Sequence, residues 1–282
     1  MKKITRRSFM AAAGLTVAAL ALTACGGSSS TASSAAASSV ASSAAASSEA
    51  ASAAAAELTT VEAGKLTMAT NAAFPPYEMT TDAGEFEGID IETAQAIADK
   101  LGLELQIDDM DFDAALLSVQ QGKADIVMAG VTVTDERKAV MDFSDSYATG
   151  IQSIIVPEGS DIASPDDLAG KKIGTQRGTT GYIYCSDDFG DENVVAYDDG
   201  LTAVQALNNG QVDAVVIDNA PAKEFVAANP GLVILDTSYA EEDYAIGMAK
   251  GSSLEDAVNA ALEELKADGT LQSIVDKYIT AE

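Results

Sequence analysis

The sequence predicts an α/β fold built as two lobes, and three observations support this prediction. Apolar, strand-like runs alternate with amphipathic helical segments from about residue 64 onward, a pattern typical of layered α/β proteins. That region holds roughly 219 residues, enough for two small hydrophobic cores. The third observation is an internal repeat.

The repeat joins residues 114–130 to residues 202–218. Each segment is a helical stretch, a glycine that can end the helix (Gly122 or Gly210), and an apolar strand. Unrelated segments can converge on such a pattern. Polar residues gather at equivalent places in the two halves, however, which favours two lobes that face one another.

The first 24 residues are predicted to be an export signal. Four basic residues come first, and residues 11–24 form an Ala/Leu-rich stretch too short to span a bilayer permanently. The run LTACG at 22–26 resembles the lipobox of bacterial lipoproteins, and this resemblance implies that Cys25 is diacylated. An ordinary signal peptide with an incidental cysteine is the alternative. The paired arginines also resemble a twin-arginine signal.

Residues 26–56 are almost entirely Gly, Ser and Ala, so they cannot bury a core and are predicted to be a linker. The predicted organisation is a lipoprotein signal peptide (1–24), the lipidated cysteine with its linker (25–63), the first part of lobe 1 (64–149), lobe 2 (150–240) and the second part of lobe 1 (241–282).

The folded region begins with a predicted buried strand at 65–70 and a loop at 71–77. Residues 89–101 predict an amphipathic helix because apolar side chains recur on one stripe, and Gly102 is placed to end it. A matching strand at 171–175 leads to a loop at 176–181 and a helical segment at 182–187. Ligands bind at the carboxyl ends of strands in open α/β sheets, so these loops predict a binding cleft.

The composition excludes several functions. Lys and Arg number 16 against 44 Asp and Glu, and the net charge of −28 repels nucleic-acid phosphates. The chain has no histidine, so a His-based triad or a His-ligated zinc site is not available. The acidic run at 108–113 lacks the glycine and glutamate of an EF-hand loop. We read it as a solvated surface and expect no metal and no cofactor.

Arginine usage is the sharpest functional signal. Beyond the export signal the chain contains only Arg137 and Arg177. If Thr134 caps a helix, Arg137 falls in its first turn, where the helix dipole disfavours a cation. A residue that breaks a local rule often marks a site, and a planar guanidinium fits a carboxylate. The alternative is a surface arginine paired with Asp135 or Glu136.

Three other features suggest the rest of a site. The run GTTG at 178–181 offers free backbone N–H groups to an anion, or it is a simple turn with a threonine cap. Asp218 ends an apolar strand, where it can hold an ammonium group or cap the helix expected near Pro221. Phe74 and Phe112, expected in loops after strands, are candidates to line a pocket, although Phe is more often a core residue.

Six short runs carry a family resemblance: GIDIE at 88–92, AGVTVTDER at 129–137, DFS at 142–144, QRGTT at 176–180, VID at 216–218 and DGT at 268–270. With them, residues 64–279 resemble the family 3 solute-binding proteins of bacterial ABC amino-acid importers. The resemblance implies a two-lobe, type II periplasmic-binding-protein-like fold. Each lobe would be a mixed β-sheet flanked by helices, with crossover hinges near 148–151 and 236–244.

The resemblance also implies roles for matching residues. Arg137 matches an arginine that clamps a substrate α-carboxylate, and Asp218 matches the carboxylate that receives the α-ammonium group. Asn71 stands where an aspartate is common, which favours a polar uncharged ligand over a cationic one. The implied ligand contacts are Asn71, Phe74, Phe112, Ala129, Gly130, Thr132, Arg137, Gln176, Thr179, Thr180 and Asp218.

The expected function is capture of one amino acid by closure of the lobes and its delivery to a membrane permease. The implied partners are the free amino acid, an ABC permease/ATPase complex and, through a lipid anchor, the outer face of the cytoplasmic membrane; nucleic acid is not a partner, and we expect a monomer. Two alternatives remain open. One is a dehydratase-like enzyme of the same fold, with Asp218 and Glu78 as available acids, and the other is an extracellular amino-acid sensor.

Overall fold

The computed structural model describes residues 58–279. The predicted signal peptide, Cys25 and all but the end of the predicted linker lie outside these residues. Across residues 58–279, no helix is both long enough and apolar enough to cross a membrane. The described region is the one in which the sequence predicts the two lobes.

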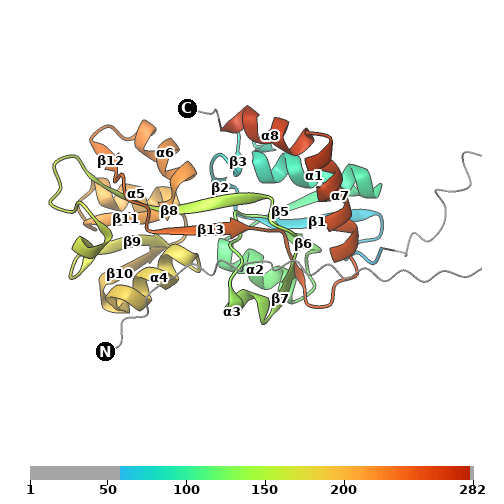
Figure 1. The fold of residues 1–282 in the computed structure, drawn as a ribbon, viewed down its shortest axis with the longest axis horizontal. Helices are drawn as coiled ribbons and strands as arrows, with labels where there is room; N and C mark the ends of the chain where they lie inside the picture. The colour runs from blue at the N-terminus through green and yellow to red at the C-terminus, as the bar shows by residue number, and fades with distance from the viewer. Residues whose placement is uncertain (1–57, 280–282) are drawn as a thin grey trace, which may run out of the picture. The chain divides into compact units, whose positions relative to one another are not determined.

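The first lobe is built on a five-stranded mixed sheet (Figure 1). Its strands are β1 (Lys65–Thr70), β5 (Glu104–Asp109), β6 (Ile126–Val127), β7 (Met141–Phe143) and β14 (Gly247–Ala249), in the order β5-β1-β6-β14-β7. Strands β5, β1 and β6 are parallel, whereas β14 runs antiparallel to β6 and β7. Strand β14 follows the strands of the second lobe in the sequence, so the chain returns to this sheet after it has formed the second lobe.

Helices cover both faces of the first sheet (Figure 1). They are α1 (Ile89–Leu101), α2 (Phe112–Gln120), α3 (Asp135–Lys138), α7 (Glu255–Ala267) and α8 (Thr270–Tyr278). Helices α1, α7 and α8 pack together, while α2 packs on β1 and β14. A small antiparallel sheet lies beside them, formed by β2 (Ala73–Phe74), β3 (Glu78–Thr80) and β4 (Phe86–Glu87).

The second lobe has a six-stranded mixed sheet. Its strands are β8 (Ala148–Pro157), β9 (Ile173–Gln176), β10 (Val194–Tyr197), β11 (Ala214–Asp218), β12 (Leu232–Ile234) and β13 (Ala240–Tyr244), in the order β10-β9-β11-β8-β12 with β13 also paired to β8. Its helices are α4 (Thr180–Phe189), α5 (Gly200–Asn208) and α6 (Asn219–Ala228), with short 3₁₀ turns at Pro165–Leu168 and Asp191–Asn193. The predicted pattern of mixed sheets flanked by helices is confirmed in both lobes.

Local sequence signals explain several of these elements. Strand β1 and helix α1 have the bounds that the sequence predicts, and the apolar stripe of α1 is buried. Gly102 ends α1 in the left-handed region at φ 69°, a conformation that favours glycine. The internal repeat is also confirmed, since Gly122 stands between α2 and β6 and Gly210 between α5 and β11.

The predicted loop positions of two phenylalanines are wrong. Phe74 is paired with Glu78 in the hairpin formed by β2 and β3. Phe112 is the first residue of α2, which begins after Asp111 inside the acidic run. Both side chains are buried. Strands of two or three residues carry too little periodicity to be recognised from sequence.

Two predicted elements in the second lobe are displaced. The strand expected at 171–175 is β9, which begins at Ile173 and takes its register from β10 and β11. The helix expected at 182–187 is α4, which begins earlier and ends later. It begins at Thr180 because the hydroxyl of Thr179 accepts a hydrogen bond from the Tyr182 N–H, as a typical N-cap does.

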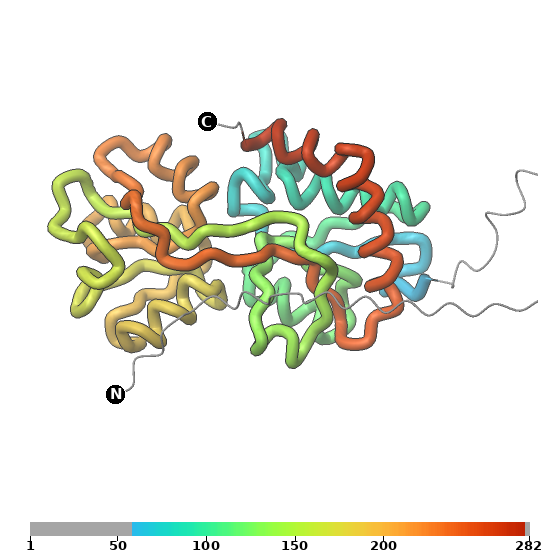
Figure 2. Tube along the Cα trace, in the orientation of Figure 1, coloured from blue at the N-terminus to red at the C-terminus, as the bar shows by residue number. Residues whose placement is uncertain are grey.

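Strands β8 and β13 connect the two lobes and lie side by side along their whole shared length (Figure 2). They are antiparallel, with Ala148 opposite Tyr244 and Gln152 opposite Ala240. A Cβ atom at Gly150 would lie 2.5 Å from the Tyr244 ring, so only glycine fits there. These are the two crossover segments that the sequence predicts near 148–151 and 236–244.

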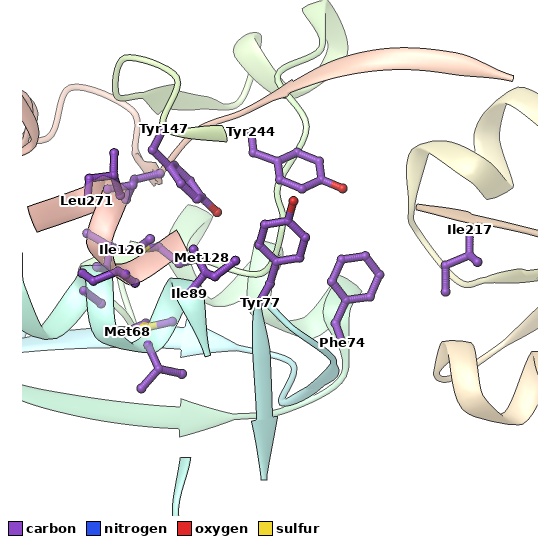
Figure 3. Packing of buried hydrophobic residues seen from close by; sticks show 14 of the residues in the cluster. Met68, Phe74, Tyr77, Ile89, Ile126, Met128, Tyr147, Ile217, Tyr244 and Leu271 are labelled. Carbon is purple, nitrogen blue, oxygen red and sulfur yellow. The ribbon is translucent and has the colours of Figure 1, made fainter. Parts of the chain in front are cut away.

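The main hydrophobic core reaches the cleft through a row of aromatic rings. Tyr77 stacks on Phe74 with ring centroids 5.9 Å apart and meets Tyr244 edge-on at 5.3 Å. Figure 3 shows these three rings at the end of the cluster that faces Ile217 of the second lobe. Each buried large side chain adds about 1.5–3 kcal/mol, so burial of these rings contributes to stability as well as forming part of the cleft wall.

Candidate functional site

A nearly closed cavity lies between the lobes, and we call it the cleft cavity. Its free volume of about 10 Å³ is on the scale of one water molecule. Every sequence-predicted ligand contact except Asn71 lines it, and Glu78 is added. The lining residues are Phe74, Glu78, Phe112, Ala129, Gly130, Thr132, Arg137, Gln176, Thr179, Thr180 and Asp218.

Arg137 is held inside the cavity by backbone carbonyls of both lobes. Its Nη1 donates to the Thr132 carbonyl at 2.8 Å and its Nη2 to the Gly178 carbonyl at 3.1 Å. The Arg137 side chain is only 7% exposed, and its guanidinium carbon lies 5.4 Å from the centre of the Phe112 ring. The predicted Thr134 cap is confirmed, because that hydroxyl accepts from the Arg137 N–H.

This geometry excludes one of the two interpretations of Arg137. Its sequence neighbours Asp135 and Glu136 are exposed, whereas Arg137 is buried. A surface ion pair with either neighbour is therefore wrong. The guanidinium lies in the cavity that Asp218 also lines, so an anionic group entering the cavity would meet a buried cation.

Asp218 comes from the other lobe, at the end of β11. Its carboxylate accepts hydrogen bonds from the Tyr244 hydroxyl and, at 2.8 Å, from Nε2 of Gln152. Asp218 occupies the N-cap position of α6, as one interpretation predicts, but its side chain makes no capping hydrogen bond to that helix. Burial, together with the charge of Glu242, raises the pKa of Asp218 to about 7, although its two hydrogen bonds oppose the rise.

Glu242 accepts three hydrogen bonds, two of them from threonines that line the cavity. Its Oε2 accepts from the hydroxyls of Thr132 and Thr180 and from Nε2 of Gln152, each at 3.0 Å. One donor comes from each lobe and the third from β8. Sequence reasoning missed Gln152, Glu242 and Tyr244. An acid and a tyrosine at alternating positions of a crossover strand are the signal that would have found the last two.

Gln176 and Asn71 bond to each other across the cleft. Gln176 Nε2 donates to Asn71 Oδ1 at 2.9 Å, and Asn71 Nδ2 donates to the Met110 carbonyl at 2.9 Å. Asn71 is buried but does not line the cleft cavity. The Asn71 side chain is thus held by one bond from the second lobe and one to the first.

The loop at 178–181 contains the predicted threonine cap, and two of its residues line the cavity. Thr179 caps α4 with its hydroxyl, while Thr179 and Thr180 line the cavity. Ala129 and Gly130 line the opposite wall. Gly130 has φ +55°, and a Cβ atom there would lie 2.9 Å from the Phe74 ring. Its N–H donates to Asp90 at 2.9 Å, so the wall is fixed from behind.

A second cavity, with a free volume of about 280 Å³, lies beside β8 and α6. It touches Asp218 and Tyr244 but includes none of Arg137, Thr132 and Thr180. Among the described pockets, only the cleft cavity is therefore lined by both Arg137 and Asp218. Within residues 58–279, no group of three or more acidic or cysteine side chains is placed to hold a metal ion.

Comparison with known proteins identifies relatives over nearly the whole described region. The sequence profile described as bacterial extracellular solute-binding proteins, family 3, matches residues 66–281. The chain is 33% identical over 226 residues to the L-cystine-binding protein TcyJ of Escherichia coli K12, covering 78% of this chain and 85% of that protein. It is 33% identical over 228 residues to the arginine-binding extracellular protein ArtP of Bacillus subtilis 168, covering 77% and 87%.

Two solved structures of amino-acid-binding proteins also match this chain in fold and sequence. An ancestral arginine-binding protein bound to glutamine matches with a TM-score of 0.74 and 42% identity, covering 77% of this chain and 99% of that one. The arginine-, lysine-, histidine-binding protein ArtJ of Geobacillus stearothermophilus also has a TM-score of 0.74, at 34% identity and with coverage of 77% and 96%.

Proposed function

This chain belongs to the bacterial extracellular solute-binding proteins, family 3, and we propose that it holds one free amino acid in the cleft cavity as the substrate-binding component of an ABC importer. The observation that carries this proposal is the pairing of Arg137 and Asp218. One is a basic and the other an acidic side chain, they come from different lobes, and they line one buried cavity.

A zwitterion fits this pair. Its α-carboxylate would take the guanidinium of Arg137 with the hydroxyls of Thr132 and Thr180, and its α-ammonium group would take Asp218. Both poles lose water together when the lobes meet, so the ligand favours the closed state over the open one. An amino acid exceeds 10 Å³, so it would enter with the lobes apart and replace direct bonds such as Arg137 to Gly178.

A thermal-shift screen of free L-amino acids tests this function. A ligand that binds only the folded state at about 100 times its Kd adds about 2.7 kcal/mol of stability. We expect at least one polar amino acid to raise Tm and to be recovered unchanged by mass spectrometry. A panel in which no amino acid moves Tm would contradict binding, and a converted ligand would point to an enzyme.

We further propose that Cys25 is lipidated and that residues 25–63 tether the monomeric body outside the cytoplasmic membrane. Labelling of the full chain in a bacterial host with an alkyne fatty acid should modify the wild type but not Cys25→Ser, which should leave the membrane fraction. Cys185→Ser is the matched control, because Cys185 is buried in the second lobe, and it should be labelled like the wild type. An unlabelled wild type would contradict the anchor.

A further inference from the structure

One peptide unit in the wall of the cleft cavity is held from outside that cavity. It joins Ala129 to Gly130, and both residues line the cavity. The Gly130 N–H donates to the Asp90 carboxylate at 2.9 Å. Asp90 belongs to the first turn of α1, is fully buried and does not line the cavity. The Gly130 N–H therefore points away from the cavity, toward the far side of the wall.

The geometry of the peptide bond makes this contact a constraint on the Ala129 carbonyl. In a trans peptide, the C=O of one residue and the N–H of the next point in opposite directions. The only cis peptide bond among the described residues joins Pro75 to Pro76, so the bond between Ala129 and Gly130 is trans. Because the Gly130 N–H is on Asp90, the Ala129 carbonyl points toward the cleft cavity.

That carbonyl has no donor within the described part of the chain. Ala129 is 3% exposed, and no described residue donates a hydrogen bond to its carbonyl oxygen. Buried carbonyl oxygens nearly always accept a hydrogen bond, so this one is available to a donor that enters the cavity. In the proposed site that donor is the α-ammonium group, whose three N–H bonds need more acceptors than Asp218 alone.

Asp90 makes a second hydrogen bond, which reaches the crossover strands. Its other carboxylate oxygen accepts from the Tyr147 hydroxyl at 2.7 Å. Tyr147 immediately precedes β8, and its own N–H donates to the Tyr244 carbonyl at 3.0 Å. Both partners of Asp90 are donors, so a carboxylate, which has two acceptor oxygens, satisfies both. The two bonds offset the cost of burying this charge.

Gly130 gives the peptide unit freedom to turn if the bond to Asp90 is lost. Its φ is +55°, and glycine adopts positive and negative φ about equally readily. A buried N–H that lost its acceptor would turn toward another one. Because the peptide unit is planar, the same rotation would carry the Ala129 carbonyl away from the cavity. Asp90 thus supplies an orientation that the local backbone does not impose.

We propose that Asp90 is a positioning residue for amino-acid binding: it holds the Gly130 N–H so that the Ala129 carbonyl accepts a hydrogen bond from the α-ammonium group. The inference rests on the proposed function. It adds a residue outside the cavity to the ammonium end of the site, where Asp218 is the charged contact. Every α-amino acid carries this ammonium group, so loss of Asp90 should weaken ligands with different side chains by the same factor.

Titration calorimetry with L-arginine, L-histidine, L-glutamine and L-cystine tests this inference on folded Asp90→Ala and Asp90→Asn. Asp90→Ala removes both acceptor oxygens and should weaken each ligand that binds the wild type by roughly 10-fold or more, as loss of a hydrogen bond to a charged group does. Asp90→Asn keeps an oxygen for Gly130 and an amide that can donate to the Tyr147 hydroxyl. It should bind within about threefold of the wild type.

Tyr147→Phe is the matched control, because it removes the other hydrogen bond of Asp90 and leaves the one from Gly130. It should lower Tm but leave each Kd within about threefold of the wild type. A purely structural role for Asp90 predicts the same binding in Tyr147→Phe and Asp90→Ala, and that result would overturn the inference. A loss below about threefold in Asp90→Ala, or no recovery in Asp90→Asn, would also overturn it.

Nuclear magnetic resonance of the wild type tests the geometry even if Asp90→Ala does not fold. The Gly130 N–H should be protected from hydrogen exchange both with and without ligand, because its acceptor is Asp90. The carbonyl carbon of Ala129 should change its chemical shift when an amino acid binds. Protection of Gly130 only with ligand, or none at all, would overturn the inference. Failure of all four amino acids to bind the wild type would instead overturn the proposed function.

Discussion

Replacing Arg137 with alanine is expected to weaken amino-acid binding by about 3–5 kcal/mol, or roughly 150- to 5,000-fold. The substitution leaves the ligand carboxylate, Glu242 and Asp218 in a buried site without a guanidinium. Removing one member of a buried charge pair is more damaging than losing a surface ion pair, because the remaining charge stays desolvated. Titration calorimetry with the best ligand measures the loss.

Two variants show whether that loss belongs to the guanidinium itself. Arg177→Ala removes the other arginine of the described region, which is half exposed and pairs with Asp198 at 3.1 Å, and it should leave Kd unchanged. Arg137→Lys keeps a charge but loses the planar fork, so it should bind with intermediate affinity. A loss below about tenfold, or 1.4 kcal/mol, in folded Arg137→Ala contradicts the assigned role.

Asp218→Asn is expected to weaken binding by roughly 100-fold, because the α-ammonium group then meets a neutral amide in a buried site. Its pH dependence is the sharper signature. The wild type must give up a proton from Asp218 to bind, and the pKa of Asp218 is raised to about 7. Affinity for a ligand with a neutral side chain should therefore fall as pH drops below about 7, toward tenfold per unit.

The Asp218→Asn variant should lose this pH dependence as well as its affinity. Its unliganded stability gives an independent check. Because the pKa of Asp218 is higher in the folded state than in the unfolded chain, ionising this residue opposes folding. Its contribution to the free energy of unfolding therefore declines as pH rises from the pKa of the unfolded chain toward 7. Above pH 7 the variant should melt no lower than the wild type. Asp187→Asn, at an exposed position of α4, should match the wild type, and a pH profile shared by Asp218→Asn would contradict the assignment.

Much of the fold follows from local signals in the sequence. The bounds of β1 and α1 were predictable because an apolar run or stripe ends at a definite polar residue or glycine. The short hairpin of β2 and β3, which pairs Phe74 with Glu78, was not, because strands of two and three residues carry too little periodicity. The start of α2 was hidden by the acidic run before Phe112, which reads as a surface loop.

Some residues of the site could be predicted from local sequence signals, and others could not. Arg137 stands out because a cation in the first turn of a helix departs from what the local structure needs, and Asp218 stands out because it ends an apolar strand. Gln152 and Glu242 do not, since their inward direction follows from the register of β8 with β13. That register is a tertiary feature, and a strand read in isolation does not contain it.

The position of Asp90 in the first turn of α1 depends on Gly88. A Cβ atom at Gly88, which has φ +131°, would overlap the Tyr77 carbonyl oxygen. Its absence lets the first turn of α1 close on the chain before β3, where the Asp90 N–H donates to that carbonyl at 2.8 Å. The GIDIE run at 88–92 thus places the Asp90 carboxylate where it accepts a hydrogen bond from the Gly130 N–H, which sequence spacing alone does not reveal.

A crystal structure of the protein with its best amino-acid ligand is the most direct test of the central claim. The account predicts a single zwitterion that spans the cleft, with its α-carboxylate on the Arg137 guanidinium and its α-ammonium group on the Asp218 carboxylate. The direct bond from Arg137 to Gly178 should then be replaced by a bond to the ligand. A ligand bound in the cavity beside β8 and α6, or one that contacts only one lobe, would contradict it.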